Sequence, residues 1–332
     1  MRIARMHVHG APENLVIDDL PTPDPAPGEV LLEVEAAALS IDQLAFLAGA
    51  DHGGAAPAEL PTGFGYEAAG AVVAVGEGVD AGWIGKRVAT VGPFDQHDHP
   101  VMATHAVLPV GLVEEYPERL SPDEAASLWV PFLTALGTIL QQPFEAGQWL
   151  ALPSGVSSVG LAAAQIARAN GLEVILSTRS SARAEQGRRL APECHVIDTS
   201  SEDYEEVVLA LTDGVGADVT FDPIGGSFLR SAMATTRVHG LVVEYGVLGG
   251  LDATVSANDL IGRMQRLAGF QVGEMLAEPH RSEAIELVTR LVGEGLATPI
   301  VAASFPLDDI HAAFEALTSD GHVGRITVRP AG

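Results

Sequence analysis

Residues 149–160 decide the fold, and they read Trp149-Leu150-Ala151-Leu152-Pro153-Ser154-Gly155-Val156-Ser157-Ser158-Val159-Gly160. The apolar run before Pro153 is typical of a buried strand, and a helical pattern covers residues 159–169. Gly155, Ser157 and Gly160 have the spacing of the dinucleotide-binding fingerprint, with serine at its middle glycine. The first glycine permits a tight turn, and the last lets the helix pack closely on the strand. A serine nucleophile elbow would need glycine at position 159, so this stretch does not indicate a hydrolase.

Strand and helix patterns alternate on the C-terminal side of this stretch. Strands are predicted at 149–152, 172–177, 194–198, 218–222 and 240–245, and helices at 159–169, 181–190, 202–211 and 227–235. Such alternation predicts βαβ units in an α/β, doubly wound parallel sheet, which binds ligands at the carboxyl ends of its strands. The tail then predicts helices at 280–293 and 308–318 and a strand at 325–328.

The first 120 residues have a different pattern, of short strands separated by glycine and proline. Strand composition is found at Val30–Val34, Ala69–Val75, Arg87–Val91 and His105–Leu108. Short strands with frequent turns indicate a small barrel or sandwich. Ser121, followed by proline and Glu124, has the form of a capping box and predicts the start of a helical segment that reaches about residue 140.

The charge and cysteine content exclude several classes of partner and setting. The chain has 44 acidic and 18 basic residues, and its formal net charge is −26. Such a surface repels nucleic acids and anionic membranes. The single cysteine, Cys194, excludes an internal disulfide, and we expect it to be buried in a reducing, cytoplasmic setting. No signal peptide and no 18-residue uncharged apolar stretch is found, so no membrane span is expected.

The end of the second predicted strand indicates the choice of cofactor. NAD-specific folds place an acid there to bind the ribose hydroxyls, whereas this sequence reads Ser177-Thr178-Arg179-Ser180. Arg179, Arg183, Arg188 and Arg189 form a basic cluster in an otherwise acidic chain. Because arginine binds phosphate in a bidentate manner, we expect Arg179, and more weakly Arg183, to bind the 2′-phosphate of NADPH. The alternative is a basic, solvent-exposed helix face, above all for Arg188 and Arg189.

Several short strings, in order along nearly the whole chain, resemble one known family. They are Pro27-Gly28-Glu29-Val30, Gly65-Tyr66-Glu67-Ala68-Ala69-Gly70, Leu133-Thr134-Ala135, Ser157-Ser158-Val159-Gly160, Asp222-Pro223-Ile224-Gly225-Gly226 and Val323-Gly324-Arg325-Ile326. Together they resemble the zinc-free, quinone oxidoreductase-like branch of the medium-chain dehydrogenase/reductase superfamily. The resemblance implies a GroES-like catalytic domain made of residues 1–121 and 266–332, a Rossmann NADPH-binding domain of residues 122–265, catalysis between the domains, and a homodimer. Relatives pair through edge strands of the Rossmann sheet, and the segment Asp252–Ser256 is the expected edge strand here.

Departures from the zinc-dependent relatives predict that the chain holds no metal. At the positions of their zinc ligands, this sequence has Ser40, Tyr66 and Val130, and only Glu67 keeps a ligand type. A catalytic zinc needs about three protein ligands. Zinc-free relatives often have Asn, Asp and Tyr where Ser40, Gln43 and Phe46 align. The loop with His97 and His99 is interpreted as a polar surface loop rather than a metal site.

The predicted function is an NADPH-dependent oxidoreductase that transfers hydride to a quinone, an enone or another conjugated carbonyl or enoyl acceptor. The catalytic candidates implied by the resemblance are Ser40, Gln43, Tyr66 and Thr134, and core packing is the alternative for Tyr66. The predicted cofactor-binding residues are Ser154, Gly155, Val156, Ser157, Ser158, Val159, Gly160, Thr178, Arg179, Ser180, Arg183, Tyr245, Gly246 and Arg325. Two alternatives stay open: an enoyl or ketone reductase of a biosynthetic pathway, and a non-catalytic NADPH-binding sensor or structural protein.

Overall fold

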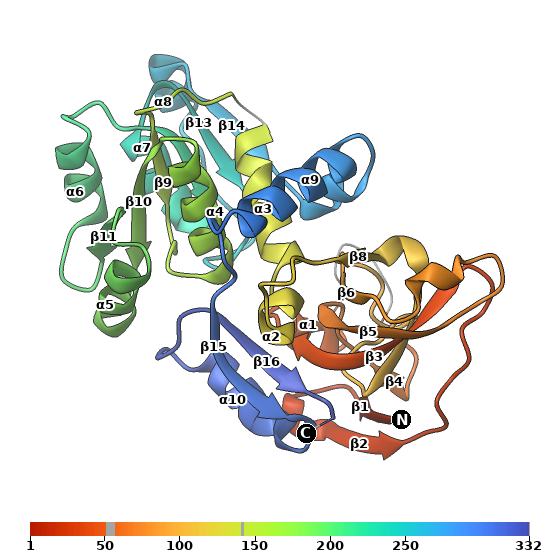
Figure 1. Ribbon diagram of the computed structural model, residues 1–332. Coiled ribbons are helices and arrows are strands. Elements are labelled where there is room, and N and C mark those ends of the chain that lie inside the picture. The colour runs from red at the N-terminus through yellow and green to blue at the C-terminus, as the bar shows by residue number, and fades with distance from the viewer. Residues whose placement is uncertain (51–56, 141–142, 332) are drawn as a thin grey trace. The chain divides into compact units, whose positions relative to one another are not determined.

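The computed structural model describes residues 1–50, 57–140 and 143–331 (Figure 1). The chain forms two compact units, unit 1 (Met1–Val130 with Thr298–Gly332) and unit 2 (Pro131–Ala297). The predicted domain boundaries, at 121 and 266, therefore differ from the observed ones. The reason is that strand β14 (Arg266–Gly269) extends the sheet of unit 2, and helix α9 (His280–Gly293) follows it in the same unit.

Unit 2 contains a six-stranded parallel sheet, which confirms the predicted α/β fold. Its strands are β9 (Trp149–Leu152), β10 (Glu173–Thr178), β11 (His195–Asp198), β12 (Ala217–Asp222), β13 (Thr236–Glu244) and β14. Their order is β11-β10-β9-β12-β13-β14, and every pairing is parallel. The chain moves outward on one side of β9 and then returns to its other side. Doubly wound sheets bind ligands at such a switch point, outside the carboxyl ends of the strands.

The helices of unit 2 lie close to the ranges that the hydrophobic pattern predicts. They are α3 (Trp129–Leu140, which begins in unit 1), α4 (Ser158–Ala169), α5 (Ser181–Leu190), α6 (Tyr204–Leu211), α7 (Leu229–Thr235), α8 (Ala257–Arg263) and α9. Helix α4 packs on β9 and β10, α5 on β10 and β11, and α7 on β12 and β13. No helix among the described residues is both long enough and apolar enough to span a bilayer.

The outer strand of this sheet differs from the one expected. Residues Asp252–Ser256 suggested an edge strand, but they lie outside any strand. The edge is β14, which pairs with β13 in the register Leu241 to Arg266. Its sequence, Arg-Leu-Ala-Gly, is short and poor in β-branched residues, so its composition alone does not indicate a strand.

Unit 1 is strand-rich, as the sequence predicts for a GroES-like domain, and it combines both ends of the chain. Its strands are β1 (Arg2–Met6), β2 (Leu15–Asp19), β3 (Glu29–Ala38), β4 (Thr62–Gly63), β5 (Ala68–Val75), β6 (Arg87–Thr90), β7 (His105–Pro109), β8 (Val113–Glu115), β15 (Val301–Pro306) and β16 (Arg325–Arg329), and its helices include α1 (Gln43–Leu47), α2 (Pro122–Ala126) and α10 (Ile310–Thr318). The C-terminal β16 pairs with β3. The predicted capping box of Ser121 and Glu124 starts α2.

Candidate cofactor and substrate sites

The glycine loop, residues 153–157, joins β9 to α4 and is built for close approach. A Cβ on Gly155 would lie 2.5 Å from the carbonyl oxygen of Leu152, and one on Gly160 would lie 2.3 Å from that of Gly155. Both positions therefore exclude a side chain, as the fingerprint requires. Ser157 is the N-cap of α4, and its hydroxyl accepts a hydrogen bond from the amide of Gly160 at 3.2 Å. Ser154 has a positive φ of 52°, which is uncommon for serine.

The four arginines of the predicted basic cluster have different surroundings. Arg188 donates to the carbonyl of Val196 at 3.0 Å, and Arg189 pairs with Glu185 at 2.7 Å. Arg183 donates from Nη2 to the carbonyl of Val156 at 2.6 Å, so it supports the glycine loop. Arg179, directly after β10, is exposed, and no hydrogen bond or ion pair joins its side chain to another described residue. Of the four, Arg179 is the one left available to a ligand.

The described residues around Arg179 offer hydroxyls and no available acid. Thr178 is buried at the end of β10, and Ser180 is the N-cap of α5. Asp198 ends the neighbouring strand β11, opposite Thr178 in the register. Its carboxylate accepts hydrogen bonds from the amide and the hydroxyl of Ser200, and hydrogen bonds from Ser181 and Ser200 hold the pKa of Asp198 below its usual value. The Asp198 carboxylate is thus already hydrogen-bonded within the protein and is not available to ribose hydroxyls.

The carboxyl ends of β12 and β13 carry two acids that the sequence analysis did not select. Asp222 and Glu244 are direct neighbours in the strand register. Asp222 is fully buried, and its carboxylate accepts hydrogen bonds from the backbone amides of Ile224 at 2.7 Å and Gly225 at 3.3 Å. Burial, the charge of Asp222 and a hydrogen bond to it raise the pKa of Glu244 to about 8. We call Asp222 and Glu244 the acid pair.

The two loops beyond the acid pair, residues 223–226 and 246–250, are hydrogen-bonded to each other. The amides of Leu248 and Gly249 donate to the carbonyls of Pro223 and Ile224, at 3.1 and 2.6 Å. A Cβ on Gly246 would lie 2.6 Å from the carbonyl of Pro223, so this predicted cofactor residue also permits close contact of the loops. The ring of Tyr245 stacks on that of Phe221, with their centroids 3.9 Å apart.

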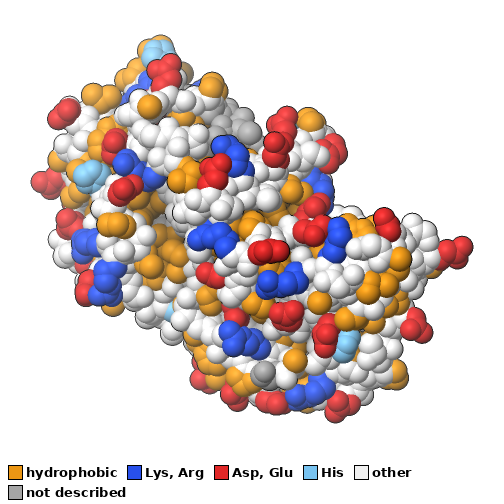
Figure 2. Space-filling view, viewed as in Figure 1, with side chains coloured by type: hydrophobic (Ala, Val, Ile, Leu, Met, Phe, Trp, Pro, Cys, Tyr) orange, Lys and Arg blue, Asp and Glu red, His pale blue; other side chains and the backbone are white. Residues whose placement is uncertain are grey.

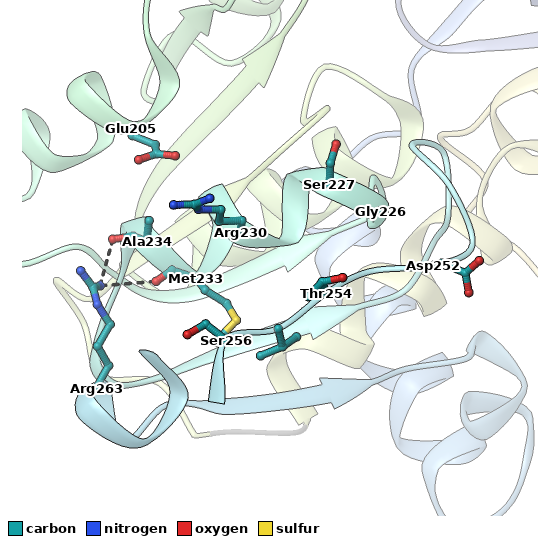
Figure 3. A pocket seen from close by; sticks show the side chains of 11 residues that line it. Glu205, Gly226, Ser227, Arg230, Met233, Ala234, Asp252, Thr254, Ser256 and Arg263 are labelled. Carbon is teal, nitrogen blue, oxygen red and sulfur yellow. Dashed lines mark hydrogen bonds between the residues drawn. The ribbon is translucent and has the colours of Figure 1, made fainter. Parts of the chain in front are cut away.

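A pocket of about 770 Å³ lies elsewhere on unit 2 (Figure 3). It lies between α7 and the segment before α8, and Glu205 and Arg230 both line it. Arg263, at one end, donates to the carbonyls of Met233 and Ala234. None of its lining residues belongs to the glycine loop or to the end of β10, so the pocket contributes nothing to the predicted adenosine and phosphate site.

Three of the four catalytic candidates lie together in unit 1, at the start of α1. The backbone amide of Ser40 donates to Oε1 of Gln43 at 3.2 Å, and the buried Nε2 of Gln43 has no partner among the described residues. The Tyr66 hydroxyl donates to the Asp42 carboxylate, whose oxygens lie 2.8 and 2.7 Å away. Burial and the charge of Asp42 raise the pKa of Tyr66, while Ser40 and Arg325 act in the opposite direction. Tyr66 therefore stays protonated at neutral pH.

Behind this cluster, Glu67 and Arg325 form a buried ion pair. Glu67 is 1% and Arg325 is 8% exposed, and the guanidinium donates to the carboxylate. Arg325, which the resemblance suggested as a cofactor residue, is thus bound to Glu67 within unit 1. A catalytic zinc does not fit the residues at these positions, because Glu67 is neutralised by arginine and the other positions hold Ser40, Tyr66 and Val130.

The remaining candidates give no further site. Thr134 is buried on α3 in unit 2. His97 lies 2.8 Å from the Thr62 hydroxyl, and His99 lies 3.3 Å from the carbonyl of Val107. Within residues 1–50, 57–140 and 143–331, no three His, Cys, Asp or Glu side chains are placed to hold a metal ion. Cys194, which was expected to be buried, is only partly buried. Burial of its thiol still raises the pKa to about 11, so the thiol is mostly protonated at neutral pH.

Sequence reasoning missed two parts of these sites, Asp42 and the acid pair. Asp42 directly precedes Gln43, and its role depends on a contact with Tyr66, 24 positions later in the sequence. Glu244 carried a usable signal, since it is an acid that directly follows the apolar run Leu241-Val242-Val243. Its partnership with Asp222, however, joins residues that are far apart in the sequence and depends on the strand register.

Comparisons with known proteins agree with this architecture. Family models described as "Alcohol dehydrogenase GroES-like domain" and "Zinc-binding dehydrogenase" match residues 26–117 and 158–291. A 2-haloacrylate reductase of Burkholderia sp. is 27% identical, and the match covers 98% of each chain. A phenolphthiocerol/phthiocerol polyketide synthase of Mycobacterium tuberculosis is 28% identical over 92% of this chain, which spans only 14% of that protein's length.

Solved structures show the same fold over the whole chain. An NAD-dependent alcohol dehydrogenase superimposes with a TM-score of 0.88 at 25% identity and covers 99% of this chain and all of its own. The Escherichia coli quinone oxidoreductase in complex with NADPH gives 0.86 at 23% identity, with the same coverage. Because both family models match in order along the chain, the chain belongs to the medium-chain dehydrogenase/reductase superfamily of oxidoreductases.

Proposed function

We propose that this protein is an NADPH-dependent reductase of a conjugated acceptor, such as a quinone, an enone or an enoyl compound. The observation that carries the cofactor choice is Arg179, an exposed arginine without a partner among the described residues, at the end of β10. The one acid at the neighbouring strand end, Asp198, is bound to Ser200. Within the part of the chain that the structure describes, an available arginine and the absence of an available carboxylate at this strand end favour a 2′-phosphate over two ribose hydroxyls.

The glycine loop supports the same proposal. The first residues of α4, Ser158 and Val159, are only partly buried, and the positive end of a helix favours an anion there. Arg183 holds the loop through Val156, and Ser157 orders the first turn through its cap. When bound, NADPH supplies a hydride; the residues of unit 2 bind and orient it.

Residues of unit 1 provide the polar groups proposed for the acceptor. Tyr66 carries a proton that its raised pKa retains at neutral pH, and it would donate this proton to an acceptor oxygen in place of the Asp42 carboxylate that now receives it. Gln43 has a buried amide group without a partner among the described residues, which suits a carbonyl oxygen. A conjugated acceptor spreads the incoming charge over its own atoms, so hydrogen bonds to its oxygen are sufficient and no zinc is required.

Oxidation of NADPH against a panel of quinones, enones and enoyl thioesters tests this proposal directly. Turnover with at least one of them supports a reductase. Submicromolar binding of NADPH without turnover supports the alternative, a non-catalytic nucleotide-binding protein. One zinc per chain in extensively dialysed protein would contradict the metal-free site, since the residues present there offer only Glu67.

Homodimer formation through β14 belongs to the same proposal. On one side β14 pairs with β13, and on its other side no described strand is bound. Exposed apolar side chains lie nearby, with Ile261 75%, Met264 55% and Leu267 39% exposed. Open strand edges with apolar neighbours favour pairing with a second copy. A monomer in sedimentation equilibrium at micromolar concentration would contradict this.

A further inference from the structure

The acid pair lies where the nicotinamide half of a bound dinucleotide is expected. In a doubly wound sheet the cofactor crosses the switch point, which here lies between β9 and β12. Arg179 at the end of β10 marks the adenosine side, so the ends of β12 and β13 form the nicotinamide side. Asp222 and Glu244 are the last residues of these two strands.

Their surroundings favour one shared proton. Burial raises the pKa of Asp222 as well as that of Glu244. Asp222, however, accepts hydrogen bonds from two backbone amides, which favour its charged form, whereas Oε1 of Glu244 is buried without a hydrogen-bond partner among the described residues. A Cβ on Gly225 would lie 3.3 Å from Oε2 of Glu244, so the loop closes tightly over this carboxyl group. Two negative charges on register neighbours in a buried site repel strongly, and a proton on Glu244 removes one of them.

Few other ionisable groups face the pair. Tyr204 of α6 and Tyr245 are both linked electrostatically to Asp222, and burial raises the pKa of each, so they stay neutral through the alkaline range. The loops 223–226 and 246–250 contain no ionisable side chain. Asp218 lies towards the other end of β12 and is paired with Arg237 at 2.6 Å. Helix α7 packs on β12 and β13, and its Arg230 is exposed and lines the pocket shown in Figure 3. The charge of the site therefore follows the proton of Glu244.

We propose that Asp222 and Glu244 share one proton on the nicotinamide side of the cofactor site and that their charge sets the relative affinity for oxidised and reduced cofactor. The oxidised nicotinamide ring is a cation, and the reduced ring is neutral. One negative charge on the pair favours the oxidised form, and loss of the shared proton adds a second charge and strengthens this preference. The inference rests on the proposed nucleotide-binding function, but it holds for either NADP or NAD.

The test measures binding and requires no turnover. Dissociation constants for NADPH, from its fluorescence, and for NADP⁺, by displacement of NADPH, are measured at pH 6.5, 8 and 9. Their ratio cancels the titration of the 2′-phosphate, which both forms carry. We expect the NADP⁺/NADPH ratio of dissociation constants to fall about three- to tenfold between pH 6.5 and 9. Glu244→Gln keeps a hydrogen-bond donor to Asp222 without a titratable proton, so its ratio should stay constant.

The controls separate this inference from the function on which it rests. Glu206→Gln, at an exposed position of α6, should behave like the wild type. A wild-type ratio that is independent of pH would overturn the inference even if Glu244→Gln fails to fold, and so would a pH-dependent ratio in a folded Glu244→Gln. If NADH binds better than NADPH, the cofactor choice is wrong, and the same ratio is measured with NAD⁺ and NADH. If no dinucleotide binds, both proposals fail.

Discussion

Two charged regions of the molecule, one in each unit, differ in how their charges are compensated. In unit 1, Glu67 and Arg325 are buried against each other, and Asp42 holds the Tyr66 hydroxyl. At the carboxyl edge of the unit 2 sheet, Arg179 has no partner among the described residues, and the neighbour of Glu244 is another acid. Acidic and basic side chains are interspersed on the face shown in Figure 2, so a charge without a counter-charge is informative. In the first region the charges are satisfied within the protein, and the second leaves room for a charged ligand.

The largest effect should come from removing one member of the compensated region. Arg325→Ala leaves the Glu67 carboxylate buried without its counter-charge, which typically costs about 3–5 kcal/mol of unfolding free energy. Urea unfolding at pH 7 measures this loss. Arg119→Ala, at an exposed arginine of unit 1, serves as the control and should stay near the wild type. The double variant Glu67→Gln/Arg325→Met should recover part of the loss, and a double variant no more stable than Arg325→Ala would show that the two charges do not depend on each other.

The second effect concerns Glu244, the glutamate without a counter-charge. Its pKa is about 8 in the folded protein and about 4.5 when exposed. Between these values the folded state binds one more proton, so the unfolding free energy falls as pH rises from 4.5 to 8 and is constant above. The slope is at most about 1.4 kcal/mol per pH unit, and partial exposure of Glu244 reduces it, so we expect about 2–3 kcal/mol in total.

Glu244→Gln removes this dependence and makes the effect measurable. The variant should equal the wild type in unfolding free energy near pH 5 and exceed it at pH 9, whereas Glu206→Gln should follow the wild type. Urea midpoints at pH 5, 7 and 9 decide the matter. A constant difference between Glu244→Gln and the wild type would mean that Glu244 does not hold a proton in the folded state.

The third effect is on cofactor choice and concerns the arginine without a partner. Arg179→Ala should weaken NADPH binding about ten- to a hundredfold and leave NADH nearly unchanged, because a charged hydrogen bond to phosphate contributes about 1.5–3 kcal/mol. The wild-type preference for NADPH should also shrink as salt rises. Fluorescence titration of both cofactors measures it, with Arg189→Ala, already paired with Glu185, as the matched control. Equal loss of both cofactors would show that Arg179 does not face the phosphate.

The fold could be predicted to the extent that its signals are local. The alternation of strand and helix after residue 149 and the close-packed Gly155 and Gly160 are encoded in short stretches, and the parallel sheet confirms them. The strand β14 was missed because its four residues lack strand composition and are held by their register with β13. The predicted domain boundary at 266 was too early for the same reason, because β14 and the helix α9 after it belong to unit 2.

The candidate site was predictable only where one residue determines it. The position of Arg179 after β10 identified it as a candidate. The local sequence does not show, however, that Arg179 lacks a partner among the described residues while Arg325 is paired with Glu67, 258 positions away in the sequence. The same holds for the acid pair, since two acids on separate strands become neighbours only through pairing of β12 with β13. Whether a charged side chain has a counter-charge depends on tertiary contacts, which composition and spacing do not reveal.

The smallest effect should be at Arg183, where sequence and structure lead to different expectations. The sequence suggests a second phosphate ligand, whose loss weakens NADPH more than NADH. In the structure its Nη2 donates to the carbonyl of Val156 at 2.6 Å, so it acts by holding the glycine loop, which either cofactor would use. Arg183→Ala should therefore weaken both about three- to fivefold, in line with about 1 kcal/mol for a lost hydrogen bond. Arg183→Gln retains a hydrogen-bond donor without the charge and should recover both affinities together. Recovery of NADH affinity alone would show that Arg183 binds the 2′-phosphate.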